Sequence, residues 1–428
     1  MRLHFYAGVL VGPFILIAAL TGALYALAPT IERLVYGDIL YVEPGGDALP
    51  LSDQAAAARA AFPRLEMSGM RPAPGPDDST RVYFIDPALA DDMLRAVFVD
   101  PYSARVLGDE ATWFGYLPLS TWLDGLHRHL NLGEPGRVYS ELAASWLGVV
   151  ALAGLYLWLV RPAVTRRRQK GRARTVNRHG AIGVWMLVFL LFLSATGITW
   201  STYAGAHVSD IRTALNWQRP QLDTAVGDHA EHAGHGSAVV DPAVVDFDAV
   251  VAAANGSGVL PPLELTLSGE PGTGVSVTEI DKPWRWTTDV AAVDPMTAEV
   301  TGEIDYWRDY SPVAMLADWG IRMHMGVLFG LLNQLLLFVV AAAVVVAIVL
   351  GYRMWWQRRP TRGTTWAVGR PPMRGGLRRV HPAVAGAVVF GAVAVGWFLP
   401  LLGISLAGFV LVDLASSAWK RRRAGHLT

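Results

Sequence analysis

Long runs of apolar residues alternate along the chain with long polar segments. Four runs can cross a bilayer as helices, because about 20 helical residues span its hydrocarbon core. They cover residues 5–28, 142–160, 181–203 and 325–350. A fifth apolar region, residues 382–418, is longer than one span needs and is interrupted at "WFLPLLG". It predicts a hairpin of two short helices that turns near Pro400.

The two long polar segments contain short stretches with the alternation typical of strands. "RVYFIDP" and "AVFVDPYSARVLG" lie in the first segment, and "WRWTTDVAAVDPMTAEVTG" lies in the second. We expect each segment to form a small α+β domain, with a short helix packed on an antiparallel sheet. The predicted fold class is therefore a membrane α-helical bundle that carries two α+β domains.

The composition also indicates a membrane protein, because 52% of the 428 residues are apolar and only 17% are charged. The net charge is zero, but residues 161–178 and 353–380 each hold eight Lys or Arg and no acidic residue. The positive-inside rule places both segments, and both chain ends, on the cytoplasmic side. Two ends on one side require an even number of spans. We expect six, with the acidic polar segments on the opposite side.

The chain contains an internal duplication of the unit span, polar segment, span. His4 and Thr21-Gly22 recur 175 residues later as His179 and Thr196-Gly197. "LHRHLNLG" and "GLYLWLVRP" recur 197 residues later as "MHMGVLFG" and "GYRMWWQRRP". "VFVDPYSARVLGD" recurs 194 residues later as "AAVDPMTAEVTGE". The duplicated spans predict a four-span core, and the C-terminal hairpin lies outside the repeat.

These patterns predict ten segments in chain order. Spans alternate with polar domains and basic loops, and a hairpin and a short tail follow. The segments are 1–28 (span), 29–127 (first polar domain), 128–160 (span), 161–178 (basic loop), 179–203 (span), 204–323 (second polar domain, with the insertion "GDHAEHAGHG"), 324–352 (span), 353–380 (basic loop), 381–419 (hairpin) and 420–428 (cytoplasmic tail).

Four of the eleven histidines are paired by the duplication, and all four lie at ends of spans. The topology places His4 and His179 at cytoplasmic ends, and His127 and His324 at outer ends. In an up-down bundle, alternate helices face each other across the core, so each pair can bring two imidazoles together. Two facing neutral imidazoles suit the iron of a b-type haem. The chain has no cysteine for iron–sulfur ligation or covalent c-type haem attachment.

The histidine pairs therefore predict two haem b groups per chain, with His129 as an alternative ligand to His127. A single histidine at a span boundary is more often an interfacial residue among lipid headgroups. Retention of all four through a divergent duplication favours ligation instead. No residue is assigned a catalytic role.

A second group of histidines lies in the inserted stretch of the second polar domain. His229, His232 and His235 are spaced by three residues, with Asp228 and Glu231 among them. Such a tract can bind a metal ion. It also lies among Gly, Ala and Ser, which are typical of a polar loop without a ligand, and the sequence leaves both interpretations open.

The spans and their histidines resemble those of the PepSY-associated transmembrane family. The resemblance rests on "LHFYAGVLVGPFILIAALTGALY", "LHRHLNLGEPGRVYSELAASWLGVVALAGLYLW", "NRHGAIGVWMLVFLLFLSATGITWS" and "GYRMWWQRRP". The Asp-Pro hairpins at Asp100 and Asp294 resemble PepSY strand–turn–strand motifs. Members of the family are bacterial inner-membrane proteins, among them ferric-siderophore reductases and iron-regulated membrane proteins. The two polar domains would then be PepSY-like and periplasmic.

The resemblance implies a membrane cytochrome that passes electrons from the cytoplasmic side to a ferric siderophore or similar chelate and releases Fe(II). Because no nucleotide- or flavin-binding glycine motif is present, we expect a separate electron donor, and no nucleic-acid partner. Two alternatives stay open. One is a haem protein serving another periplasmic acceptor or a quinol-linked donor. The other is a membrane protein whose PepSY domains only bind partners or modulate a peptidase.

Overall fold

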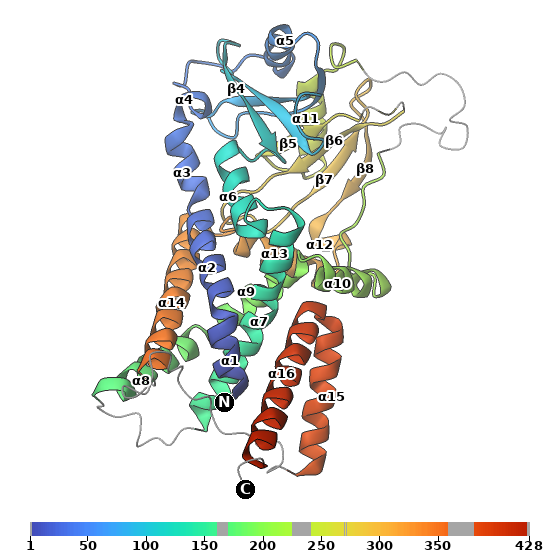
Figure 1. Ribbon diagram of the computed structural model, residues 1–428. Coiled ribbons are helices and arrows are strands. Elements are labelled where there is room, and N and C mark those ends of the chain that lie inside the picture. Colours follow the sequence, from blue (N-terminus) through green and yellow to red (C-terminus); the bar gives the residue numbers. More distant parts are fainter. Residues whose placement is uncertain are drawn as a thin grey trace. The chain divides into compact units, whose positions relative to one another are not determined.

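The computed structural model describes residues 2–160, 170–224, 241–268, 270, 272–357 and 381–425. The chain divides into two compact units (Figure 1). The helical unit comprises Met1–Leu24, Gly125–Asn216 and Leu336–Thr428, and the sheet unit comprises Tyr25–Asp124 and Trp217–Leu335. The polar segments, which the sequence predicts as two domains, thus contribute to a single compact unit.

Two helices are each long and apolar enough to cross a membrane, α7 (Glu134–Leu159) and α14 (Leu331–Trp356). Two bent pairs meet the same criterion when each is taken together: α1 (Arg2–Leu10) with α2 (Gly12–Ala26), and α8 (Gly171–Trp185) with α9 (Leu187–Thr199). The described residues therefore contain two candidate spans, or four if each bent pair is one span. They are followed by α15 (Pro382–Phe398) and α16 (Pro400–Gly425), whose break at Leu399 lies where the sequence predicts the hairpin turn.

The two bends fall at corresponding positions of the duplication. Val11 separates α1 from α2, which meet at 56°, and Met186 separates α8 from α9, which meet at 59°. The two residues are 175 positions apart, the same offset that relates His4 to His179. The duplication therefore extends to the shape of the helices.

Proline accounts for the first bend. Pro13 has no N–H to bond the carbonyl oxygen of Val9, four residues earlier. The Tyr352 hydroxyl of α14 donates to that oxygen instead, over 2.8 Å. At the second bend, Val188 occupies the position that corresponds to Pro13. The two repeats therefore share the bend, but a missing proline N–H cannot be its cause in the second repeat.

Helix α7 is central to the packing of the helical unit, where it contacts α1, α8, α9 and α16. Trp146 of α7 is fully buried, and its indole N–H donates to the Ser405 hydroxyl of α16 over 2.9 Å. Helices α15 and α16 run side by side (Figure 1). They approach so closely that a Cβ added to Gly403 would lie 2.3 Å from the carbonyl oxygen of Gly396.

Glu141 is a buried carboxylate in the apolar helix α7. Its hydrogen-bond partners explain why a charged group is tolerated there. Its two oxygens accept hydrogen bonds from the backbone N–H groups of Tyr203 (2.9 Å) and Ala204 (3.0 Å). These residues open α10 (Tyr203–Ala214), whose first N–H groups have no partner within the helix. Negative charge is also favourable at a helix N-terminus, so Glu141 has a structural role.

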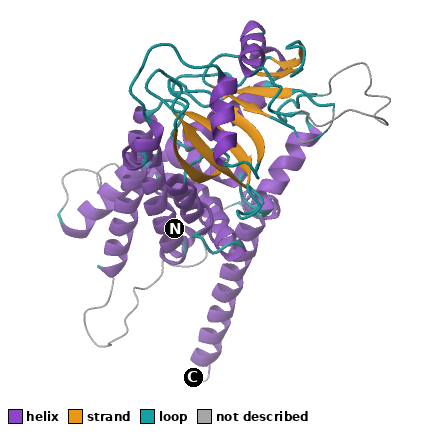
Figure 2. Cartoon of the chain, turned by 90° about the horizontal axis from the view of Figure 1, so that it is seen from above, coloured by secondary structure: helices purple, strands orange, loops and turns teal. Residues whose placement is uncertain are grey.

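The sheet unit is built on one antiparallel sheet whose order, within the described residues, is β4-β3-β2-β1-β5-β6-β7-β8. Each polar segment contributes four strands, and Figure 2 shows them in orange. The strands are β1 (Glu66–Arg71), β2 (Thr80–Ile85), β3 (Met93–Val99), β4 (Val106–Trp113), β5 (Leu263–Thr266), β6 (Val275–Glu279), β7 (Val290–Val293) and β8 (Val300–Ile304).

The junction between the two halves of the sheet is the pair β1 and β5. Met70 lies opposite Leu265 there, and Gly69 lies opposite Thr266. A Cβ added to Gly69 would come within 2.3 Å of the Leu265 carbonyl oxygen, so a larger residue would push the strands apart. Glycine at this position therefore allows eight strands to form one sheet.

The duplication is visible in the strands as well. The register shifts between Phe98 and Val99 in β3 and between Ala292 and Val293 in β7, positions 194 residues apart. The Asp-Pro turns that follow these strands have the same backbone conformation in both repeats. Ala104 (φ 54°) and Ala298 (φ 55°), at corresponding positions, are both left-handed. This bulge and turn are thus properties of the repeated unit.

Helices α5 (Leu51–Ala61) and α11 (Phe247–Gly256) cover one face of the sheet. Met70, Val82, Val97, Leu265 and Val277 are buried beneath them in one apolar core. The remaining helices of this part of the chain are α3 (Ala28–Val35), α4 (Gly37–Leu40), α6 (Pro118–His129), α12 (Tyr306–Asp309) and α13 (Pro312–His324), with α6 running across the boundary between the units.

Candidate functional site

The structure brings His4 and His179 together in the helical unit. His4 lies on α1 and His179 on α8, and their ring centres are 6.1 Å apart with the ring planes inclined by 70°. The residues are separated by most of the first repeat, so only the packing of the helices can join them. They form the candidate site that the duplication predicts at this end of the spans.

Each ring is held by a carbonyl oxygen from a different helix. His4 Nδ1 lies 3.1 Å from the Val150 oxygen of α7, and His179 Nδ1 lies 2.8 Å from the Ala347 oxygen of α14. A carbonyl can only accept, so Nδ1 carries the proton in both rings and Nε2 keeps its lone pair. Val150 and Ala347 are 197 positions apart, so the duplication preserves the partners as well as the histidines.

Glycines leave room beside both rings. A Cβ added to Gly154 would lie 3.2 Å from His4 Cε1, and one added to Gly351 would lie 3.8 Å from His179 Cε1. These glycines are again 197 positions apart. Gly8 and Gly183 face open space, with nothing within 4 Å of an added Cβ.

Two neutral imidazoles with Nε2 available are a donor set that would hold haem iron. An imidazole nitrogen lies about 2 Å from a bound transition metal, so two rings whose centres are 6.1 Å apart could both reach one ion. Ligating histidines also commonly donate their other N–H to a carbonyl, which fixes the tautomer and ring orientation. Both rings have this bond.

His127 is held in a related way by the first span. Its Nδ1 lies 3.1 Å from the hydroxyl oxygen of Thr21, which itself donates to the Ile17 carbonyl over 2.9 Å. The carbonyls of Ile17 and Ala18 both lie within reach of the hydroxyl proton, so we assign the Thr21 oxygen as the acceptor of the His127 N–H. The His127 ring also has a backbone hydrogen bond to Ala18. A Cβ added to Gly22 would lie 3.0 Å from His127 Cε1, so the adjacent glycine permits this approach.

Thr21 was missed by sequence reasoning as a partner of His127. The sequence marks Thr21 only as part of the repeated Thr-Gly pair, and its hydroxyl also bonds the Ile17 carbonyl of its own helix. The signal that could have found it is the duplication, which preserves Thr21-Gly22 as Thr196-Gly197 while preserving His127 as His324. Two features retained together in both repeats indicate a shared role.

His129 differs from His127 in its surroundings. Its Nδ1 is buried and has no hydrogen-bond partner within the described residues. The ring therefore lacks the orienting bond found at His4, His127 and His179. This contrast favours His127 over His129 as the ligand from α6.

His324 belongs to the sheet unit, whereas His127 belongs to the helical unit. His324 is the last residue of α13, which Arg322 anchors by an ion pair with Asp318 (2.7 Å) and a hydrogen bond to the Arg285 carbonyl (3.0 Å). The pairing of His127 with His324 stays a prediction.

The other predicted metal site, at His229, His232 and His235, lies outside the described residues. Within the described residues, no group of three or more His, Asp or Glu side chains is arranged to hold a metal ion.

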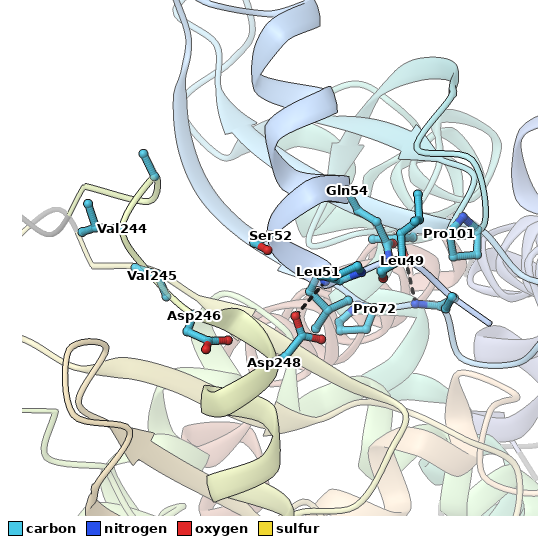
Figure 3. A pocket seen from close by; sticks show the side chains of 15 residues that line it. Leu49, Leu51, Ser52, Gln54, Pro72, Pro101, Val244, Val245, Asp246 and Asp248 are labelled. Carbon is cyan, nitrogen blue, oxygen red and sulfur yellow. Dashed lines mark hydrogen bonds between the residues drawn. The ribbon is translucent and has the colours of Figure 1, made fainter.

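An open pocket of about 850 Å³ lies between the first turns of α5 and α11 (Figure 3). Its polar groups bind their neighbours: Asp248 accepts from the Leu51 N–H (2.9 Å), and Asp246 accepts from the Ala249 N–H (3.0 Å). The Gln54 amide donates to the Leu49 carbonyl over 2.7 Å. The bond between Leu51 and Asp248 joins the two halves of the sheet unit, and the other two are local. We assign the pocket no ligand.

Comparison with known protein families gives a match over most of the chain. The profile of the PepSY-associated TM region matches residues 1–358, which include both repeats and all four paired histidines. No curated protein matches the chain.

Proposed function

The chain belongs to the PepSY-associated TM region family, and we propose that it is a di-haem b cytochrome of the bacterial inner membrane. It would pass electrons from a separate donor on the cytoplasmic side to a ferric siderophore or similar chelate in the periplasm, and so act as an oxidoreductase that releases Fe(II). The observation that supports this most directly is the pair His4 and His179, 6.1 Å apart and each held through Nδ1.

Haem bound at these histidines would supply one-electron chemistry, with its potential set by ligation, burial and hydrogen bonding. The protein's part is to hold two neutral imidazoles with Nε2 available. The carbonyls of Val150 and Ala347 do this for the first pair by accepting the Nδ1 protons. Thr21 does the same for His127.

The proposed arrangement in the membrane follows the charge pattern. The basic segments 161–178 and 353–380 and both chain ends would be cytoplasmic, and the sheet unit would be periplasmic. The bent pairs would each count as one span, and the C-terminal hairpin would bring the total to six. An electron would enter near His4 and His179 and leave near His127 and His324. One electron converts the Fe(III) of the chelate to Fe(II), which binds hard oxygen ligands more weakly.

The proposal is tested by visible spectroscopy of the purified protein, oxidised and reduced with dithionite, with haem counted per chain. We expect a low-spin b-type spectrum and two haems. His4→Ala and His179→Ala should remove the same haem, and His127→Ala and His324→Ala the other. His207→Ala, at a histidine stacked on Trp397 and predicted to ligate nothing, should keep both.

The alternatives give different results. A colourless protein from haem-supplied cells would overturn the cytochrome and leave a partner-binding PepSY protein. If the reduced protein is reoxidised by a quinone but by no ferric chelate, the haems are retained and the ferric acceptor is wrong.

A further inference from the structure

Charged residues gather at the centre of the sheet, on the face that α5 and α11 do not cover. Side chains alternate between the two faces of a strand. Met70, Val82 and Leu265 point into the apolar core, so their neighbours Arg71, Arg81 and Glu264 point to the other face. They lie on β1, β2 and β5, the three strands at the junction of the two halves of the sheet.

Two of these residues are arginines placed directly opposite each other. The register of β1 and β2 pairs Arg71 with Arg81. Like charges directly opposite on neighbouring strands destabilise a sheet. The arrangement therefore needs a compensating negative charge.

Gly115, in the loop before α6, is the point where the polar groups of this face meet. Arg81 Nη1 donates to the Gly115 carbonyl over 3.1 Å. A Cβ added to Gly115 would lie 2.8 Å from Arg71 Nη2 and 3.1 Å from the Tyr83 hydroxyl. Gly115 has φ +77°, which also favours glycine. Both guanidinium groups and a phenol thus surround one backbone position.

Within the described residues, only one of the two arginines forms an ion pair with a carboxylate, although Glu32 lies close enough to Arg81 to attract it electrostatically. Glu264 accepts from Arg71 at 2.6 Å, and its side chain is 30% exposed. Although burial acts against it, the pKa of Arg71 is raised by Tyr83 and Glu264. Arg71 is therefore a stable cation with a partner.

Arg81 has no ion pair within the described residues. It stacks on the Phe98 ring at 5.4 Å, and Glu32, a carboxylate near it, accepts instead from the Ser120 N–H (3.0 Å) in the first turn of α6. Burial, reinforced by the neighbouring Arg71, lowers the pKa of Arg81. A partly buried charge that has neutral hydrogen-bond partners but no ion pair is costly, and an anionic ligand would reduce that cost.

We infer that Arg71 and Arg81 bind carboxylate groups of the ligand, and that the ferric chelate of the proposed function is a polycarboxylate. The identification of the ligand as an iron chelate rests on the proposed function, whereas the anion site rests on the sheet unit alone. The planar guanidinium matches a carboxylate with two parallel hydrogen bonds. Arg81, which lacks an acidic partner, is the primary contact, and Glu264 competes with the ligand for Arg71.

The test measures binding of gallium(III) citrate to the full-length protein in detergent by calorimetry. Gallium(III) resembles iron(III) in charge and size but is not reduced, so binding is separated from electron transfer. Arg81→Gln should weaken binding about ten- to a hundredfold, as expected for the loss of a charge-assisted contact. Glu264→Gln should tighten it, because Arg71 is then released to the ligand.

Two further variants separate binding from folding. Arg81→Lys keeps the positive charge but cannot form the two parallel hydrogen bonds of a guanidinium with a carboxylate. This variant should bind gallium citrate with intermediate affinity. Arg59→Gln, on α5 at the covered face, should bind as the wild type does. Thermal unfolding and the haem spectrum confirm folding in each case. If Arg81→Gln and Glu264→Gln alter the unfolding temperature but leave gallium citrate affinity unchanged, the arginines are structural and the inference is wrong.

The remaining outcomes distinguish this inference from the proposed function. A protein with two haems that does not bind gallium citrate overturns the polycarboxylate ligand but leaves the cytochrome. A colourless protein that binds gallium citrate at Arg81 overturns the cytochrome but leaves the polycarboxylate site. If inorganic phosphate competes as strongly as citrate, the site takes oxyanions in general, and the polycarboxylate assignment is wrong.

Discussion

At the scale of single residues, a hydrogen bond at Nδ1 orients three of the four paired histidines. His207, which the duplication does not pair, has a similar bond to the Phe398 carbonyl, so the bond supports ligation only together with the pairing. His4 and His179 donate to carbonyl oxygens, and His127 donates to a hydroxyl. A ring held in this way presents Nε2 in a fixed direction, as a metal ligand requires. The Nδ1 of His129 has no such bond within the described part of the chain.

Thr21→Val tests the hydroxyl that orients His127. The substitution keeps the shape of the side chain but removes the acceptor 3.1 Å from Nδ1. Loss of such an orienting partner typically costs about 10- to 100-fold in metal affinity. We expect the haem assigned to His127 to be lost or to shift in potential, while the other haem is unchanged in redox titrations.

Two controls accompany this variant. Thr21→Ser keeps a hydroxyl and should restore the wild-type titration. Thr199→Val removes a hydroxyl that donates to the Thr196 carbonyl on α9 and should have no effect on either haem. If Thr21→Val titrates as the wild type does, the bond from His127 to Thr21 has no part in ligation.

At the scale of elements, the bend between α1 and α2 depends on a contact from another helix. The Tyr352 hydroxyl donates to the Val9 carbonyl, which Pro13 leaves without its usual helical partner. A second contact fits this geometry, because a Cβ added to Gly12 would lie 3.3 Å from the same hydroxyl. The bend of the first repeat is thus stabilised by the second.

A double-mutant cycle tests this contact. Tyr352→Phe leaves the Val9 carbonyl unsatisfied and should destabilise the protein by about 1–3 kcal/mol. In a Pro13→Ala background, the restored N–H can bond the same carbonyl, so Tyr352→Phe should cost much less. The measurement is the free energy of unfolding in detergent. Equal costs in both backgrounds would show that the hydroxyl and the proline are not coupled.

At the scale of the whole molecule, the two polar segments build one sheet. Strands β1 and β5 pair directly, so each half of the sheet covers an edge of the other. Unpaired edges are sites of aggregation, which gives the shared sheet a physical advantage over two separate ones. It also brings Arg71 of the first segment next to Glu264 of the second.

The arrangement in the membrane is tested by cysteine labelling, since the chain has no cysteine of its own. Ser103→Cys and Thr297→Cys lie in the two Asp-Pro turns and should react with an impermeant maleimide in intact spheroplasts. Thr165→Cys lies in the first basic segment and should react only after lysis. The positive-inside rule gives both expectations. Labelling of Thr165→Cys in intact spheroplasts would contradict the proposed topology.

Much of the element pattern could be predicted from the sequence. Apolar runs mark α7, α14 and the two bent pairs, and the repeated "VDP" stretches mark the hairpins of β3 with β4 and β7 with β8. These features depend on the hydrophobicity of short stretches and on turns formed by residues that are neighbours in the sequence. The candidate ligands His4 and His179 also followed from the sequence, because the duplication singled them out. What the sequence did not indicate was the joining of two small sheets into one.

The sequence by itself determined where the apolar helices and the strands lie and which residues correspond in the two repeats, because local periodicity and self-similarity carry that information. Tertiary structure alone decided which groups hold the paired histidines and which charges lie side by side in the sheet. His4 bonds an oxygen 146 residues away, and His179 bonds one 168 residues away. The register of β1 and β2 places Arg81 opposite Arg71. Such contacts depend on the packing of distant segments, and no local pattern specifies them.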